Sequence, residues 1–125
     1  MSPTKLFWSK SCFGDSARGW TLTLLSRRRA VCEAYIIDQP EKLELAGIYT
    51  QPEFRRMGYA RQLLESLLRD LCKMKEHRRL ELSVEPHGPE TPTPEQLIRF
   101  YISMGFETLQ PSDADTPVVM SRGIL

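Results

Sequence analysis

The amino-acid sequence predicts an α/β (α+β) fold, in which two helices accompany a mixed, mostly antiparallel sheet. Three observations lead to this prediction: a series of β-rich runs early in the chain, one strong helical period after them, and a strand, helix and hairpin pattern at the end. The expected element order is β-β-β-α-β-α-β-β. The 125 residues, 41% hydrophobic and 26% charged, are expected to form one domain, 1–125.

The first three strands are expected to form an antiparallel meander. Their ranges are 20–27, 30–38 and 42–50. Each run is rich in β-formers, and turn residues separate the runs, with Arg28 and Arg29 after the first and Gln39 and Pro40 after the second. Residues 6–8 carry a weaker strand signal ahead of the meander.

A helix is predicted over residues 58–76. Leucines recur there with the 3.6-residue period, from Leu63 to Leu71, while charged residues mark the opposite face. Residues 79–85 then alternate apolar and polar side chains, as a half-buried strand does. A strand, a helix and a strand in this order predict a right-handed parallel crossover.

The second helix is predicted to begin at Pro94 and to stop before Gly105. Thr93 is a good capping residue, Gln96 stands three positions after it, and glycine is common just beyond a helix. The proline-rich residues 86–94 are interpreted as a connector. Two short strands are expected to close the fold as a hairpin, at 106–109 and 118–121.

Composition narrows the classes of partner and compartment. The formal net charge of +1, from 17 basic and 16 acidic residues, argues against a nucleic acid or an anionic membrane as partner. No run approaches the roughly 20 apolar residues that span a bilayer, and the first residues lack the apolar core of a leader, so a cytoplasmic location is expected. The cysteines fit neither a disulfide framework nor a metal site and are interpreted as reduced core thiols, at Cys12, Cys32 and Cys72.

The segment between the third strand and the first helix carries the clearest chemical signal. A strand-to-helix turn with Gly58 and the small Ala60 lets backbone N–H groups converge on an anion, and the helix dipole adds positive potential there. Arg55 and Arg56 supply two cations that can reach phosphate oxygens. The alternative is a tight turn at Gly58 beside solvated arginines.

Two motifs resemble those of the GNAT N-acetyltransferase superfamily. Arg55-x-x-Gly58-x-Ala60 is similar to motif A of that family, and residues 97–106, with Tyr101 ahead of a Gly-Phe pair, resemble motif B. The resemblance covers residues 20–125. It implies that acetyl-coenzyme A is a co-substrate. The residues that would bind it are Ile48, Tyr49, Thr50, Arg55, Arg56, Met57, Gly58, Tyr59 and Ala60.

The resemblance also implies direct acetyl transfer to an amine in a ternary complex. The backbone amide near Ile48 would polarise the thioester carbonyl, and Tyr101 would protonate the departing thiolate; the alternative is a structural tyrosine. Glu44 is the first choice for the base, because it precedes Gly58 by the fourteen residues typical of histone-type members of the family. Glu33 and Glu81 are the other candidates.

The sequence departs from the family pattern in two places. Motif B helices of the family often begin with an asparagine that contacts the coenzyme, whereas Thr93, Pro94 and Glu95 stand here. The family also places two helices between its first two strands, and they do not fit before Trp20. We therefore expect an acceptor site that is an open groove or is completed by a second subunit, as in a homodimer.

The acceptor itself is left open by the sequence: a protein lysine, a protein N-terminus and a small amine all remain. A second class of function also remains. In it, the chain is a non-catalytic module of the same fold that acts by binding a protein partner.

Overall fold

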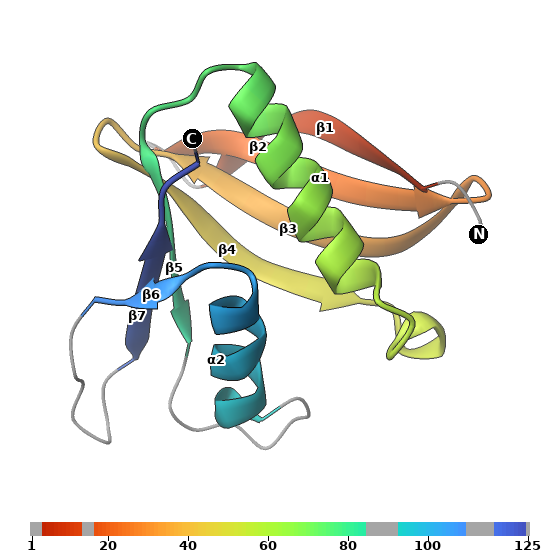
Figure 1. Cartoon of the computed structure of the whole chain (residues 1–125). Helices are drawn as coiled ribbons and strands as arrows, with labels where there is room; N and C mark the ends of the chain where they lie inside the picture. The colour runs from red at the N-terminus through yellow and green to blue at the C-terminus, as the bar shows by residue number, and fades with distance from the viewer. Residues whose placement is uncertain (1–3, 14–16, 85–92, 110–116, 125) are drawn as a thin grey trace.

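A computed structural model describes residues 4–13, 17–84, 93–109 and 117–124, and it shows a seven-stranded sheet with two α-helices (Figure 1). The strands are β1 (Thr4–Phe13), β2 (Ala17–Ser26), β3 (Arg29–Asp38), β4 (Lys42–Thr50), β5 (Arg79–Val84), β6 (Glu107–Thr108) and β7 (Val118–Arg122). The helices are the short 3-10 helix η1 (Pro52–Phe54), α1 (Tyr59–Lys73) and α2 (Pro94–Ser103). The strand order is β1-β2-β3-β4-β5-β7-β6, and only β4 and β5 are parallel neighbours. The predicted fold class and element order are confirmed, with one strand added at the start.

The added strand β1 contains residues 6–8, where the sequence has a weak strand signal. It has ten residues and pairs with β2 from Thr4 to Phe13. Only residues 14–16 separate the two strands, too few for a helix. The prediction that the family's helices are missing between the first two strands is therefore confirmed.

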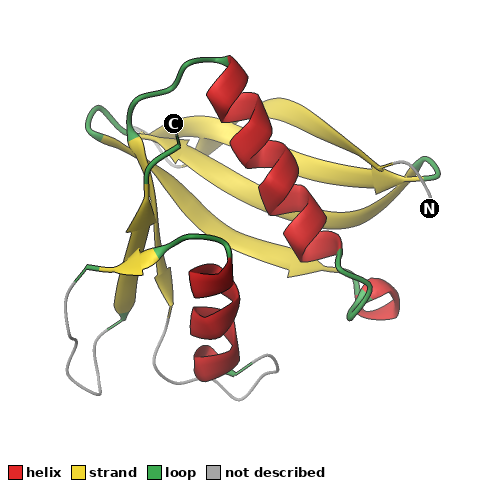
Figure 2. Cartoon of the chain, in the orientation of Figure 1, coloured by secondary structure: helices red, strands yellow, loops and turns green. Residues whose placement is uncertain are grey.

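Both helices pack on one face of the sheet, here called the covered face (Figure 2). Helix α1 contacts β1 to β4, and α2 contacts β5. Side chains of the core come from alternate strand positions, such as Leu22, Ala34 and Leu43, and they meet the leucines of α1. The opposite positions form the open face. It carries half-buried polar residues, including Thr21, Thr23, Glu33, Glu44 and Glu81.

The helix ends follow local backbone chemistry. Helix α2 begins with the predicted capping box, in which the Thr93 hydroxyl accepts from the Gln96 N–H and the Gln96 side chain accepts from the Thr93 N–H. Its last residue is Ser103, and Gly105, two positions later, has a φ of +92° and turns the chain away from the helix. Helix α1 ends three residues earlier than predicted, because Lys75 adopts a φ of +56° and the chain turns away.

Some sequence predictions are corrected or lie outside the described residues. Cys32 is buried, but Cys12 and Cys72 are exposed, so the core-thiol prediction is wrong for those two. Cys72 follows the buried Leu71, and one residue along a helix rotates a side chain by about 100°. Most of the connector at 86–94, with the Glu85 end of the predicted strand, is not described. None of the described helices combines the length and hydrophobicity needed to cross a bilayer.

Candidate active site

The loop from β4 to α1 presents unpaired backbone N–H groups at its surface. Helix α1 begins after Gly58, whose φ is +80°, and no side chain caps the first turn. A Cβ built on Gly58 would meet no atom within 4 Å, so the space above the loop is open. The first N–H groups of a helix lack intrahelical partners and attract anions, which makes this turn suitable for a phosphate group.

The two arginines of the loop play different parts. Arg55 is held against the end of β4: its Nε donates to the Thr50 carbonyl at 3.2 Å, and its guanidinium lies 5.7 Å from the centre of the Tyr49 ring. Arg56 is exposed and has a φ of +65°, and no polar partner for it occurs among the described residues. Arg56 is therefore the freer cation for an incoming anion.

Beside this loop, one edge of β4 is left without a partner strand. Strands β4 and β5 pair only from Lys42 to Glu44 and from Arg79 to Glu81, and beyond that they diverge (Figure 1). β5 continues against β7, whereas no described strand pairs with this edge of β4 from Leu45 onward. The free N–H and C=O groups of that edge can bind an extended amide-containing ligand.

The same part of β4 contains a β-bulge. Ala34 of β3 pairs with Ile48 and Ile36 pairs with Leu45, so Ala46 and Gly47 lie opposite a single residue. Gly47 has a φ of +110°, a conformation that favours glycine. The bulge turns the amides next to Ile48 out of the regular ladder, and bulges are frequent beside active sites.

Tyr101 lies in the core next to these elements. It is 6% exposed, and its ring packs edge-on against Phe100 at 5.2 Å and Phe106 at 5.6 Å between centres. Burial raises the pKa of Tyr101 to about 12, with a smaller contribution from Cys32. Its hydroxyl makes no hydrogen bond within the part of the chain that the structure describes. At neutral pH the phenol is thus a protonated, unused donor.

Cys32, which belongs to the same buried core as Tyr101, contacts the end of β4. The Cys32 Sγ and the Thr50 Oγ1 are hydrogen bonded at 3.4 Å, and Thr50 is the last residue of the strand. Burial raises the pKa of the Cys32 thiol above its ordinary value, so the thiol is neutral. The end of β4 is thus attached to the buried core that contains Tyr101.

The three candidate glutamates lie on the open face, away from Tyr101. Glu44 and Glu81 are register partners at the point where β4 and β5 diverge, and Glu33 is paired with Tyr49. Glu81 is held in an ion pair with Lys42 at 2.7 Å, which raises the pKa of that lysine. No ion pair or hydrogen bond to the Glu44 carboxylate occurs among the described residues, so Glu44 is the more available base.

Arg61 follows Arg55 and Arg56 in a basic cluster of the sequence, and its contacts with α2 were not predicted. In the first turn of α1, it donates to Ser103 Oγ at 3.0 Å and to Met104 Sδ at 3.1 Å, and its guanidinium lies 5.7 Å from the centre of the Phe100 ring. It thereby ties α1 to α2. A contact between residues 42 apart in sequence leaves no periodic signal that could have predicted it.

A family profile described as an acetyltransferase (GNAT) domain matches residues 21–108 of this chain. The chain belongs to the GNAT acetyltransferase family. The match contains both motifs and all the predicted coenzyme-binding residues. No curated protein sequence gives a significant match.

Solved structures of GNAT proteins are similar to this one in fold. One is the ribosomal-protein-S18-alanine N-acetyltransferase from Escherichia coli, at 22% identity and a TM-score of 0.66, covering 85% of this chain and 69% of that one. Another is the PaiA N-acetyltransferase from Thermoplasma acidophilum in complex with coenzyme A, at 17% identity and a TM-score of 0.65, covering 82% of this chain and 59% of that one. A third is Ard1 from Thermoplasma volcanium, at 22% identity and a TM-score of 0.65, covering 84% of this chain and 70% of that one.

Within this GNAT domain, the predicted site residues fall into two groups. Residues 48–50 and 55–60 are connected where Arg55 donates to the Thr50 carbonyl, and Tyr101 lies in the buried core on the covered face. Glu44 lies on the other face of the same strand. At the start of α2, where the family often has an asparagine, the Thr93 hydroxyl oxygen accepts from the Gln96 N–H in the capping box.

Proposed function

We propose that this GNAT domain transfers the acetyl group of acetyl-coenzyme A directly to an amine while both substrates are bound. A single observation carries the proposal: the unpaired edge of β4 joins an open, uncapped helix start at one end to Tyr101 on the covered face and Glu44 on the open face. We propose also that residues 1–125 act as one acetyltransferase domain.

The coenzyme is proposed to lie along β4 and over the start of α1. Its diphosphate accepts hydrogen bonds from the N–H groups around Gly58, with Arg56 as the nearer cation. Its pantetheine arm, which contains amides, pairs with the backbone of Ile48, Tyr49 and Thr50. The amide displaced by the Gly47 bulge then polarises the thioester carbonyl, as a preorganised donor does in an oxyanion hole.

Tyr101 is proposed to assist the departure of the thiolate. A phenol with a pKa near 12 remains protonated when the C–S bond breaks, so it can donate a hydrogen bond to the developing charge on sulfur. An ordinary thiol has a pKa of about 8.5, so complete proton transfer from Tyr101 is uphill. Hydrogen bonding to the thiolate is therefore the larger part of its contribution.

The acceptor amine is proposed to approach from the open face, where Glu44 takes its proton. The face carries hydroxyl and carboxylate side chains that remain half-buried without a covering helix, so it can admit an extended polypeptide. A protein amine is therefore our preferred acceptor. One structural relative acts on an alanine of a ribosomal protein, which fits this reading.

The test is thiol release from acetyl-coenzyme A in the presence of peptides with a free N-terminus, peptides with an internal lysine, and a small polyamine. We expect peptide-dependent release that Glu44→Gln lowers about 10²- to 10⁴-fold in kcat, because a general base contributes that much. Glu81→Gln is the matched control and should lose far less. Equal losses in both variants would contradict the role of Glu44, and coenzyme binding without any acceptor-dependent release would favour the non-catalytic module.

A further inference from the structure

An apolar cavity lies at the end of α1 opposite to the Gly58 loop. Its volume is about 190 Å³. Four strands supply its floor, with Trp8, Trp20, Ile36 and Leu43, while Leu71 from the last turn of α1 forms a wall. The acetyl-transfer site described above uses none of these residues.

The two tryptophans give this cavity an aromatic lining. Trp8 and Trp20 are diagonal neighbours across the β1–β2 pair, with ring centres 5.8 Å apart in an edge-to-face arrangement. The indole N–H of Trp8 already donates to Asp70 Oδ2 at 2.9 Å. The side chain of Met74, 59% exposed, lies at the same cavity and is flexible enough to adapt to different shapes.

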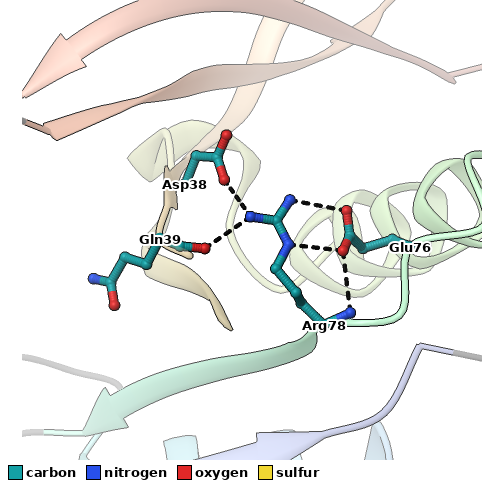
Figure 3. A network of polar contacts seen from close by, with 4 residues as sticks. All are labelled: Asp38, Gln39, Glu76 and Arg78. Carbon is teal, nitrogen blue, oxygen red and sulfur yellow. Dashed lines mark hydrogen bonds and ion pairs between the residues drawn. The ribbon is translucent and has the colours of Figure 1, made fainter. Parts of the chain in front are cut away.

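The two charged residues that line the cavity, Arg78 and Glu76, form an ion pair with each other (Figure 3). Arg78 donates through Nε and Nη2 to the two carboxylate oxygens of Glu76, at 2.8 and 3.0 Å, and through Nη1 to Asp38 and to the Gln39 carbonyl. Both charges that line the cavity, on Arg78 and Glu76, are thus already neutralised by protein partners. An ion entering the cavity would find no free counter-charge.

We propose that this cavity binds a small uncharged aromatic molecule. An apolar protein cavity of about 150 Å³ can hold benzene, so the volume here suffices for one ring. Two tryptophan rings offer edge and face contacts that a bound ring can use and an aliphatic chain cannot. The site is independent of acetyl transfer and lies where α1 meets the sheet, so a bound ring stabilises the folded chain.

The first test is a titration of the whole chain with benzene, followed by tryptophan fluorescence. Trp8 and Trp20 are the only tryptophans of the sequence and both line the cavity, so the signal reports directly on it. We expect a saturable change and a higher melting temperature. Benzoate and benzylammonium should bind at least about tenfold more weakly, because each would bury an uncompensated charge. An unsaturable response, or equal binding of the charged compounds, would overturn the proposal.

Variants locate the binding. Leu71→Phe places a ring into the cavity and should remove the saturable response, whereas Leu109→Phe makes the same change at an exposed residue elsewhere and should preserve it. Should Leu71→Phe lose its far-ultraviolet circular dichroism, Met74→Glu serves instead, since Met74 is exposed and a carboxylate there disfavours an aromatic guest. Benzene binding that survives in a folded variant at Leu71 or Met74 would place the ligand outside this cavity.

Discussion

The burial of Tyr101 determines what this residue can contribute. The hydroxyl of an exposed tyrosine is hydrogen bonded to water. Tyr101 instead packs against Phe100 and Phe106, and burial raises its pKa to about 12. A donor that is protonated and unpaired before the ligand arrives pays little reorganisation when charge develops next to it. The proposed role of Tyr101 as a donor is thus supported by its buried environment as well as by its position in the motif.

Tyr101→Phe should slow acetyl transfer without weakening coenzyme binding. The change removes only the hydroxyl, and we expect kcat to fall about 10²- to 10³-fold, as for the loss of one preorganised hydrogen-bond donor, while the Kd for acetyl-coenzyme A stays within about twofold. Because the pKa of Tyr101 is raised to about 12, its donor is present throughout the neutral and mildly alkaline range. The ratio of the kcat of the parent to the kcat of Tyr101→Phe should therefore be constant from about pH 6 to 10. A kcat equal to that of the parent, with chemistry rate-limiting, would leave Tyr101 a packing role only.

Two glycines show how far single residues could be interpreted from sequence. Gly58 was identified because it ends a strand-to-helix turn beside arginines, and the structure gives it the left-handed φ that such a turn needs. Gly47 was treated as an ordinary strand residue. Its signal was present, since an isolated glycine within a strand often marks a bulge, but the sequence alone gives no register against β3.

The two ends of helix α1 differ chemically. Its first turn is uncapped and open for an anion, whereas the chain just after its last turn is hydrogen bonded to the β3–β4 turn in a polar network (Figure 3). In that network Arg78 joins Glu76, just after the helix, to Asp38 and Gln39. The hydrogen bonds from Arg78 lower the pKa of Glu76 from 4.5 to about 2. The network orients α1, and with it the Gly58 loop, against the sheet.

Arg78→Met should destabilise the fold in a pH-dependent manner. At neutral pH we expect a loss of about 1–3 kcal/mol, because two carboxylates and a carbonyl lose a charged donor. The depressed pKa of Glu76 means that its ionised form stabilises the native state above about pH 4.5, and that this contribution disappears as the pH falls toward 2. The difference between parent and variant, measured by urea unfolding, should therefore shrink over that range.

The matched control for this experiment is Arg69→Met, which removes an exposed arginine on α1. It should change stability by less than about 0.5 kcal/mol at every pH. If the Arg78 and Arg69 variants behaved alike, or if the Arg78 effect did not depend on acid, the network would not fasten α1.

At the scale of elements, periodicity and turn chemistry predicted most of the structure. The capping box at Thr93, the stop at Gly105 and the bounds of β4 follow directly from local residues. β1 was underestimated because its apolar residues Leu6, Phe7 and Trp8 are consecutive and do not alternate with polar ones; its pairing with β2 decides its length. The predicted end of α1 is too late, because lysine is a good helix former and nothing in the sequence indicates that Lys75 adopts a left-handed conformation.

The whole molecule is organised by the difference between its two faces. All leucines of the α1 core pack on the covered face, which also holds Tyr101, whereas the open face carries hydroxyl and carboxylate groups beside apolar side chains such as Ile37. Residues 4–13 form an edge strand in the plane of the sheet, so they do not cover Glu33, Glu44 or Glu81, and these remain half-buried. The open face thus leaves polar side chains partly accessible to solvent. Its acceptor could not be predicted, because specificity depends on what binds to that surface.

The central claim, that acetyl-coenzyme A binds across β4 and the Gly58 loop, is tested most directly by calorimetric titration of the parent chain and of Gly58→Glu. A Cβ at position 58 would meet no atom within 4 Å, and the φ of +80° adds backbone strain for any residue other than glycine, so folding of the variant is checked first by circular dichroism. The glutamate side chain brings a negative charge to the proposed diphosphate site. Cys72→Glu adds the same charge to an exposed position of α1 far from the loop. We predict saturable binding to the parent and to Cys72→Glu, and at least about 100-fold weaker binding to Gly58→Glu. A folded Gly58→Glu variant that binds acetyl-coenzyme A as tightly as the parent would contradict the account.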